Sequence, residues 1–283
     1  MRSKVINLAE FRRDIRTRLV EKGDENPDNT SLVLIGSSLN KAKTWILSHG
    51  EYELTSTETH TLQSHLAQYL QGVPLPYILG SWDFYNRPFK VTPDVLIPRP
   101  ETELLVEKAI EFGQSLESLS IIDVGTGSGI IAVSLAANLA HADVFALDIS
   151  RAALAVAKEN AISHHQARIK FIQSDLLTPF QGKFNLICAN LPYIPSIKME
   201  TLQVTKWEPR LALDGGTSGL NLIEKLLEQA KTNLAPGGCI LLEIESSLGK
   251  PGLDIVSNIF PEANRQLIQD LADFDRVLQI QLP

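Results

Sequence analysis

Apolar residues recur at helical spacing in the N-terminal part of the chain. They stand three or four positions apart in two stretches, at Leu8, Phe11, Ile15 and Leu19 and again at Leu62, Leu66, Tyr69 and Leu70. This spacing places the apolar side chains of each stretch on one face of a helix. The polar segment GDENPDN at 23–29 predicts a break between helices. We therefore predict a small helical domain over residues 1–73.

The helical period is lost in the segment that follows this domain. Residues 71–80, QGVPLPYILG, are rich in proline and glycine, which is typical of a linker. In residues 81–98 two strand-like runs are separated by NRP, and this arrangement predicts a hairpin. We assign residues 74–98 to a linker that contains a β-hairpin.

Short apolar runs alternate with helical patterns over residues 99–283. A helix over 99–113 opens this part, with Pro100 in its first turn and with Glu101 and Glu103 near the positive end of its dipole. Strands are then predicted over 119–123, 143–148, 169–173, 184–189, 238–244, 264–268 and 276–281. Helices are predicted over 129–139, 151–163, 219–234 and 252–259.

This alternation predicts an α/β domain with a mostly parallel sheet of seven strands and helices on both faces. Only a short segment that contains DLADFD separates the last two strands. Because a parallel crossover needs a longer connection, these two strands are predicted to pair as an antiparallel C-terminal hairpin. Five parallel strands followed by such a hairpin is the layout of a class I methyltransferase sheet.

Composition excludes several broad classes of protein. The 283 residues are 44% hydrophobic and 21% charged, a balance that is typical of a globular chain with a sizeable core. The net charge of −7 disfavours a general nucleic-acid binder, which needs cationic surface for phosphates. Cys188 and Cys239 lie in apolar strand-like runs, so we predict buried thiols in a reducing compartment and expect no metal site.

We next consider membrane-spanning segments and targeting signals. No apolar run reaches membrane-spanning length, and no secretory signal is visible. The first twenty residues hold six Lys or Arg and two acids. A transit peptide is one interpretation, but acids are scarce in such peptides, which favours a solvated amphipathic helix. We expect a cytoplasmic protein without membrane contact.

A glycine-rich turn follows the first strand of the parallel sheet. The segment IIDVGTGSGI at 121–130 has the spacing G-x-G-x-G, with an acid two residues before the first glycine. The dinucleotide fingerprint is G-x-G-x-x-G, and a phosphate loop needs G-K-[ST], so neither fits. The segment resembles the S-adenosylmethionine (AdoMet) loop of class I methyltransferases. That resemblance implies cofactor-binding roles for Asp123, Gly125, Thr126, Gly127, Ser128 and Gly129.

Two further acids end neighbouring strands. Asp148 lies at the carboxyl end of the second strand, where a carboxylate can accept hydrogen bonds from both ribose hydroxyls, and Ile149 follows it. An N-cap for the helix at 151–163 is the alternative for Asp148, although Ser150 is an equally good candidate. Asp175 and Leu176 end the third strand, where such enzymes line the adenine; the alternative for Asp175 is a plain turn acid.

The fourth strand ends in CANLPYIP at 188–195. Asn190, Leu191, Pro192 and Tyr193 resemble the (Asn/Asp/Ser)-Pro-Pro-(Tyr/Phe/Trp) motif of amino-methylating enzymes, and Leu191 replaces the first proline. The resemblance implies that the Asn190 side-chain oxygen and the Leu191 carbonyl accept the two N–H bonds of a planar NH₂ group. Tyr193 would stack on that group. Catalysis would then consist of positioning and electrostatics, without a strong base.

Five segments in order resemble the HemK/PrmC family of release factor glutamine methyltransferases over nearly the whole chain. The segments are PLPYILG, VTPDVLIPRPETELLVE, DVGTGSG, NLPYIP and EPRLALDGG. The resemblance implies methylation of the glutamine in the Gly-Gly-Gln motif of class I peptide chain release factors. It also implies that the N-terminal domain recognises the release factor and that the loop around Arg99–Glu103 lies near the active site.

The sequence departs from the family pattern at three places. Besides Leu191, Ser218 stands where the family often has Asp, and LLEIESSLG at 241–249 replaces the usual Glu-x-Gly segment. A further question concerns Glu208, Pro209 and Arg210, which either shape the substrate pocket or form a surface loop held by salt bridges.

Three other functions remain open from the sequence. The same Asn-x-Pro-Tyr chemistry could serve an exocyclic amino group of a nucleic-acid base, which would be flipped out of the helix. A glutamine of a ribosomal protein is a closer variant. A non-catalytic AdoMet-binding scaffold is the third. We expect a release factor as the protein substrate, no stable nucleic-acid binding and a monomer.

Overall fold

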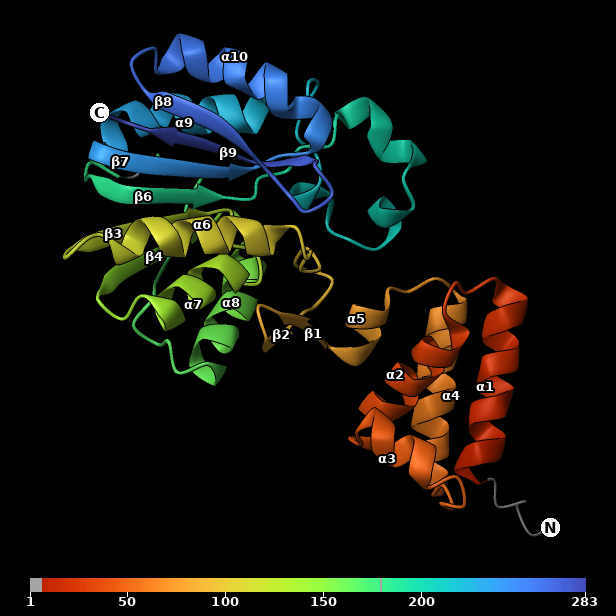
Figure 1. Cartoon of the computed structure of the whole chain (residues 1–283). Coiled ribbons are helices and arrows are strands. Elements are labelled where there is room, and N and C mark those ends of the chain that lie inside the picture. The colour runs from red at the N-terminus through yellow and green to blue at the C-terminus, as the bar shows by residue number, and fades with distance from the viewer. Residues whose placement is uncertain (1–6, 179) are drawn as a thin grey trace. The chain divides into compact units, whose positions relative to one another are not determined.

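The computed structural model describes residues 7–178 and 180–283, and these residues divide into two compact units. The units are Met1–Gly80 and Ser81–Pro283 (Figure 1). Residues 1–6, which belong to the predicted N-terminal domain and amphipathic helix, lie outside the described residues. No helix in the described ranges is long and apolar enough to cross a membrane.

The first unit consists of helices. Their bounds are α1 Leu8–Lys22, α2 Pro27–Leu39, α3 Lys43–Ser48, α4 Ser56–Leu70 and α5 Leu75–Leu79. The two apolar stretches seen in the sequence form their common core, and Tyr69 and Leu70 are its partly buried members. The polar break is built from three local signals: Gly23 is left-handed at φ 82° after α1, Asn26 caps α2, and Pro27 opens α2.

The second unit begins with the predicted hairpin, but its turn differs from the prediction. The strands are β1 Ser81–Phe84 and β2 Arg87–Lys90, and the turn is Tyr85-Asn86, both with positive φ, instead of NRP. Pro88 lies inside β2 opposite Asp83. This register buries Phe84 and Phe89, whose rings are 6.1 Å apart. The aromatic pair therefore sets the turn two residues earlier than Pro88 suggested.

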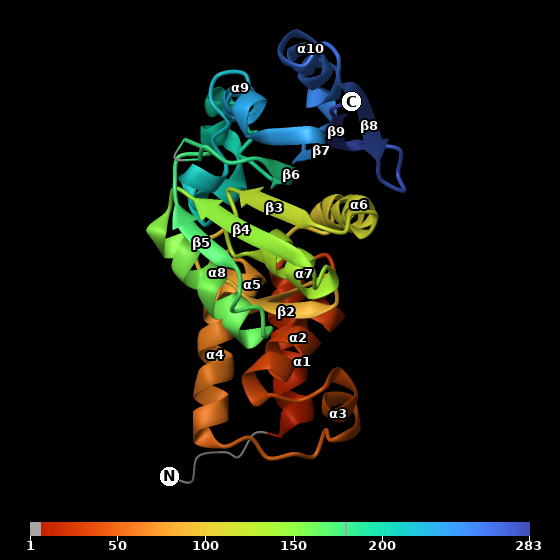
Figure 2. The same cartoon turned by 90° about the vertical axis from the view of Figure 1, so that its left-hand side faces the viewer.

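The seven-stranded sheet confirms the predicted α/β fold. Its strands are β3 Leu119–Val124, β4 Ala142–Asp148, β5 Lys170–Gln173, β6 Phe184–Ala189, β7 Leu234–Glu243, β8 Asn264–Gln269 and β9 Asp275–Gln281. The order is β5-β4-β3-β6-β7-β9-β8 (Figure 2). The last two strands pair antiparallel as predicted. In addition, β9 inserts between β7 and β8 and is antiparallel to both.

Helices cover both faces of this sheet. The long helices are α6 Thr102–Gln114, α7 Ile130–Asn138, α8 Arg151–Ser163, α9 Asn221–Asn233 and α10 Gly249–Ile259. Short 3-10 turns are η1 Ser196–Thr201, η2 Gln203–Lys206, η3 Arg210–Ala212 and η4 Ser246–Leu248. The prediction that Pro100 lies in the first turn of a helix was wrong. Pro100 precedes α6 in a tight turn, where its carbonyl accepts the Glu103 N–H at 3.0 Å.

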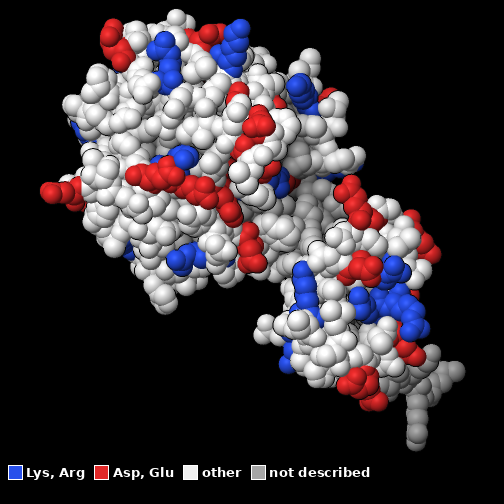
Figure 3. Space-filling view, in the orientation of Figure 1, with Lys and Arg blue, Asp and Glu red and all other residues white. Residues whose placement is uncertain are grey.

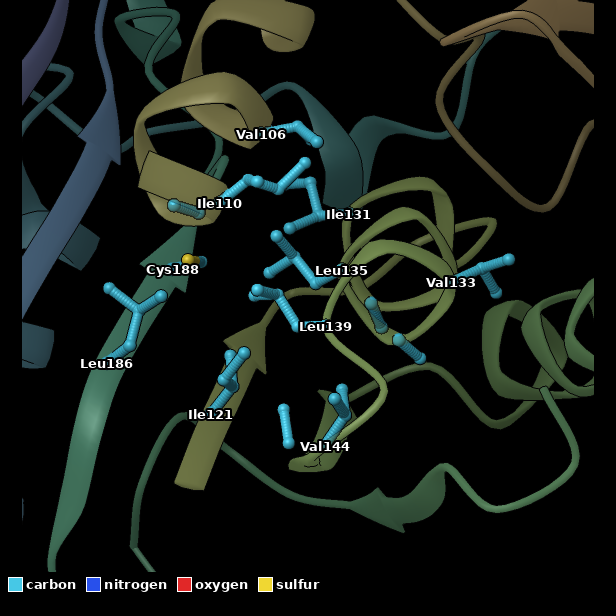
Figure 4. Packing of buried hydrophobic residues seen from close by; sticks show 14 of the residues in the cluster. Val106, Ile110, Ile121, Ile131, Val133, Leu135, Leu139, Val144, Leu186 and Cys188 are labelled. Carbon is cyan, nitrogen blue, oxygen red and sulfur yellow. The ribbon is translucent and has the colours of Figure 1, made fainter. Parts of the chain in front are cut away.

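Two apolar cores lie on opposite faces of the sheet. Helices α6 and α7 cover one face, and Figure 4 shows Val106 and Ile110 meeting Ile131 and Leu135 above the strands. Helices α9 and α10 cover the other face. Because side chains alternate along a strand, Ile121 and Asp123 point to the α6 face, whereas Ile122 points to the α9 face.

Both cysteines confirm the prediction of buried strand thiols. Cys188 in β6 and Cys239 in β7 are free and fully buried. Burial raises the pKa of Cys188 well above the usual value and raises the pKa of Cys239 to about 12. Thiolates at these positions would have no solvation, so the thiols act as small apolar groups.

Asn160 of α8 joins three separate segments. Its Nδ2 donates to the Ser128 carbonyl at 2.8 Å and to the Lys90 carbonyl at 3.0 Å, and its Oδ1 accepts the Lys90 N–H at 2.7 Å. These bonds fasten the hairpin and the glycine turn to one helix. Since Asn160 is 1% exposed, water cannot take its place as the hydrogen-bond partner of these backbone groups.

We expect Asn160→Ala to lower the free energy of unfolding by about 3 kcal/mol, because it leaves buried backbone groups unpaired. Urea unfolding of the full chain measures this value. Lys158→Ala, on the exposed side of the same helix, is the control and should change it by less than about 0.5 kcal/mol. An equal effect of both substitutions would contradict the role assigned to Asn160.

Candidate active site

A cavity opens at the carboxyl ends of the central strands. It encloses about 1120 Å³, including its open mouth. Strand order reverses between β3 and β6, and this reversal is where open parallel sheets leave a crevice for ligands. The lining residues come from the segments 94–102, 124–131, 148–153, 174–176, 190–192 and 209–222.

Most of the residues predicted from the sequence line this one cavity. Those that do are Gly125, Thr126, Gly127, Ser128, Asp148, Ile149, Asp175, Leu176, Asn190, Leu191 and Pro192. Asp123, Gly129 and Tyr193 are outside the lining. The structure therefore brings together the turns after β3, β4, β5 and β6, as expected for residues at one edge of a parallel sheet.

The glycine turn has a backbone that other residues rarely adopt. Gly125, Gly127 and Gly129 have φ values of 75°, 55° and 83°. A Cβ on Gly127 would meet no atom within 4 Å, so this backbone faces open space. A Cβ on Gly129 would lie 3.0 Å from the Ala157 Cβ, which means that the third glycine serves close helix packing.

Asp123 supports the glycine turn from within the protein. It is fully buried, and its Oδ2 accepts the Thr126 hydroxyl at 2.6 Å and the Ala132 N–H at 3.2 Å. Its Oδ1 has no hydrogen-bond partner among the described residues. Burial raises the pKa of Asp123 to about 7. This carboxyl group connects the end of β3 with the start of α7.

Asp148 faces the cavity from the end of β4. Its Oδ2 accepts the Gly127 N–H at 2.9 Å, and its Oδ1 accepts the Ser150 N–H at 2.8 Å. Burial raises the pKa of Asp148 in spite of these hydrogen bonds. The N-cap of α8 is Ser150, whose side chain accepts the Ala153 N–H. The capping alternative for Asp148 is therefore wrong, and its carboxylate is available at the cavity wall.

Asp175 and Leu176 line the cavity after β5. Leu176 is buried and has a positive φ of 53°, an uncommon conformation for a leucine. The Ser174 hydroxyl holds this conformation by donating to the Leu176 carbonyl at 2.6 Å. Asp175 pairs with Lys225 of α9 at 2.5 Å, and both side chains are about half exposed. Leu176 therefore presents an apolar wall beside an ion pair at the rim.

Asn190 stands at the end of β6, next to the glycine turn. Its Nδ2 donates to the Thr102 hydroxyl at 3.1 Å. A Cβ on Gly125 would lie 3.0 Å from Leu191 Cδ2, so the two turns are in direct contact. Tyr193 is half-buried outside the lining, and burial together with the nearby Glu243 raises its pKa to about 12. The phenol is therefore neutral.

The segment after Asn190 is fastened to the LDGG sequence at 213–216. Ile194 N–H donates to the Leu213 carbonyl at 3.0 Å, and Gly215 N–H donates to the Ile194 carbonyl at 2.8 Å. Asp214 accepts the Ser196 hydroxyl at 2.6 Å, and this bond lowers the pKa of Asp214. The EPRLALDGG motif thus supplies the backbone that stiffens the loop after β6.

Glu208 joins the two segments that form the cavity mouth. It is buried, pairs with Arg99, and accepts the Ile97 N–H at 3.0 Å. Pro209 lines the cavity, whereas Arg210 is exposed and pairs with Asp214 at 3.1 Å. Of the two interpretations left open for this segment, pocket shaping describes Glu208 and Pro209, and a surface salt bridge describes Arg210.

Sequence reasoning missed two buried polar residues beside Asn190, and one of them, Thr102, lines the cavity. Thr102 lies at the start of α6 and is 0% exposed, and Glu243 ends β7 and is 2% exposed. An acid at the end of an apolar strand was the available signal for Glu243. Thr102 fell within the Arg99–Glu103 loop without being singled out.

Gly215 leaves no room for a side chain. A Cβ there would lie 2.6 Å from the Pro192 carbonyl oxygen and 2.7 Å from the Tyr193 Cα. We expect Gly215→Ala to lower the free energy of unfolding by about 2 kcal/mol through overpacking, as measured by urea unfolding. Gly182→Ala is the control, because no atom lies within 4 Å of that position. Equal stability of the two variants would contradict the close approach.

Comparisons with known proteins agree with this architecture. The family described as Methyltransferase domain matches residues 115–273, and the PrmC N-terminal domain family matches residues 10–80. The 16S rRNA N2 G1207 methyltransferase of T. thermophilus, solved with AdoMet and guanosine, superposes with a TM-score of 0.52. It covers 72% of this chain and 50% of that chain at 16% identity, which shows a shared fold only.

Similarity to curated relatives identifies the family of this chain more specifically. A release factor glutamine methyltransferase of Moorella thermoacetica is 41% identical over 262 residues, which cover 92% of this chain and 93% of the relative. One of Chlorobaculum tepidum is 36% identical over 288 residues and covers 97% of each chain. Because these similarities span both units, the chain belongs to the release factor glutamine methyltransferase family.

Proposed function

We propose that this protein transfers a methyl group from AdoMet to the side-chain amide nitrogen N5 of a glutamine. The substrate is the glutamine of the Gly-Gly-Gln motif in class I peptide chain release factors. The observation that carries the proposal is that the glycine turn and Asn190 line one cavity. The names of the relatives, which span both units, support the choice of substrate.

The residues of the cavity suit AdoMet. The open backbone at Gly127 lets a ligand approach the start of α7 closely, and the Asp148 carboxylate lies beside it at the end of β4. We assign the ribose hydroxyls to Asp148, and the adenine to Ile149, Asp175 and Leu176. Asp123 supports this site through the glycine turn. The bound cofactor supplies an electrophilic methyl group on a sulfonium sulfur.

The chain's own residues then orient the amide. The lone pair of an amide nitrogen is delocalised, so the nitrogen is a poor nucleophile. Two acceptors aimed at its N–H bonds, the Asn190 Oδ1 and the Leu191 carbonyl, fix its direction and favour pyramidalisation. The role of the residue at 191 uses only its carbonyl, which leucine supplies as well as proline, and Pro192 keeps Leu191 extended. Tyr193 follows the lining residue Pro192 and is itself outside the lining; we assign to it stacking on the amide plane.

The remaining assignments follow from this reaction. We assign release factor recognition to residues 1–73 and methyl transfer to residues 99–283, with residues 74–98, which contain α5 and the hairpin, as the connecting segment. The enzyme acts as a monomer in the cytoplasm, where peptide release takes place, and has no membrane or stable nucleic-acid contact. Acidic and basic side chains are mixed on the face in Figure 3. The net charge of the chain is −7. A ribosomal-protein glutamine or a base amino group is the less favoured alternative.

Methyl transfer from labelled AdoMet to a purified, unmethylated release factor tests the proposal. The control substrate is the same factor with its Gly-Gly-Gln glutamine changed to alanine. We expect label on the first substrate and none on the second. Equal labelling of both would refute the site, and no labelling of either with AdoMet binding intact would refute the substrate.

Two substitutions separate cofactor binding from catalysis. We expect Asn190→Ala to lower kcat about 100-fold or more, because an acceptor for the amide is lost, while the Kd for AdoMet stays within twofold. Asp148→Ala should instead weaken AdoMet binding by about 10- to 100-fold, the range for a hydrogen bond to a charged group. Calorimetry gives Kd, and labelled transfer gives kcat. Full turnover by Asn190→Ala would exclude the proposed role.

A further inference from the structure

A buried polar cluster lies beside Asn190, and of its two members only Thr102 lines the cavity. Its members are Thr102, at the start of α6, and Glu243, at the end of β7. The Glu243 Oε2 has no hydrogen-bond partner among the residues that the structure describes. The side chains of Thr102 and Asn190 face this carboxyl group closely enough to lower its pKa by hydrogen bonding. Burying a carboxylate lowers the stability of the fold, which indicates that Glu243 has a role beside the Asn190 amide.

The sheet register creates this cluster. Ala189 pairs with Leu242 across the parallel strands β6 and β7, so the next residues, Asn190 and Glu243, are neighbours. Ala189 and Leu242 point to the α9 core. Alternation along the strands therefore turns Asn190 and Glu243 to the opposite face, where α6 begins with Thr102.

We infer that Glu243 and Thr102 are positioning residues that hold the Asn190 amide with its Oδ1 toward the cavity. In this orientation the oxygen accepts an N–H of the substrate amide. The inference extends the proposed function, because it explains how the acceptor at residue 190 is kept in the productive direction.

The direction follows from the chemistry of the three groups. An ionised carboxylate only accepts hydrogen bonds, so the hydrogen bond with Thr102 that lowers the pKa of Glu243 has the Thr102 hydroxyl as its donor. The lone pairs of that hydroxyl are then left to accept, and the Asn190 Nδ2 donates to them at 3.1 Å. With its nitrogen occupied, the amide presents Oδ1 on the other side. A flipped amide would place two donors against the donors of the substrate.

Titratable side chains from three segments lie near Glu243. Glu101 before α6 raises its pKa, Arg276 of β9 lowers it, and Tyr193 of the loop after β6 lies close by. Burial is the largest influence and raises the pKa of Glu243 to about 7. Below this pH the protonated carboxyl group can donate, and the direction of the Thr102 hydroxyl is no longer fixed. We expect kcat to fall as pH decreases through about 7.

The first test does not depend on the substrate. In the ¹⁵N-labelled full chain, the Asn190 side-chain NH₂ signals are identified by their absence in Asn190→Ala. We expect these signals to shift with pH around 7 in the wild type and in Glu245→Gln, an exposed control on the same segment. The shift should disappear in Glu243→Gln. An unchanged shift in Glu243→Gln would overturn the inference even if another substrate is methylated.

The second test is kinetic. Glu243→Gln and Thr102→Val keep the shape of the side chain, and we expect each to lower kcat by roughly 10- to 100-fold, as small misplacements do. The Kd for AdoMet should stay within twofold. Thr102→Ser keeps the hydroxyl and should retain most of the activity, and Glu245→Gln should be unchanged. Wild-type kcat in Glu243→Gln, or equal losses in Thr102→Ser and Thr102→Val, would overturn the inference.

The pH profile separates Glu243 from Asp123, whose pKa is also raised to about 7. Titration of Asp123 persists in Glu243→Gln, whereas that of Glu243 does not. We therefore expect the fall in kcat below pH 7 to be smaller in Glu243→Gln than in the wild type. Superimposable profiles would assign the fall to a group other than Glu243, such as Asp123, and contradict the role of Glu243. A wild type inactive on release factors would refute only the proposed function and leave the spectroscopic test valid.

Discussion

The parallel pairing of β3 with β6 is the constraint on which the rest of the site depends. Val124 and Ala189 are partners at the ends of these strands, so the glycine turn and Asn190 begin side by side. Neither segment forms a site alone, because one offers open backbone and the other an amide. Their contact through Gly125 and Leu191 brings cofactor chemistry and substrate chemistry into one cavity.

Two buried acids lie on the α6 face of the sheet, where burial disfavours their charged forms. Asp123 and Glu243 both lie on it, each with one carboxylate oxygen that has no hydrogen-bond partner among the described residues. Burial raises both pKa values to about 7. Each acid lies beside a segment that must keep one shape, the glycine turn for Asp123 and the amide of Asn190 for Glu243. Burial of these two acids costs stability, and each of them supports the geometry of the segment beside it.

Loops that look independent in the sequence hold one another in the fold. The segment 192–196 is bound to 213–216 by backbone hydrogen bonds, and Glu208 connects 203–212 with the residues before α6. These hydrogen bonds and this ion pair hold together the loops that line the cavity, as ladders of hydrogen bonds hold strands and helices. They also bring the segments IPRPET, NLPYIP and EPRLALDGG together at one cavity.

The sequence by itself determined the helices and strands and the edge of the sheet that carries the candidate site residues. Apolar periodicity depends on the chain alone, so the strands, most helices and the turns holding Gly125, Asp148 and Asn190 could be predicted. Tertiary structure decided the rest. The hairpin turn differs from the prediction because two phenylalanines are buried together, and Tyr193 lies outside the cavity lining. The partnership of Thr102 and Glu243 arises from strand register and from a helix start that is distant in the sequence, which no local pattern encodes.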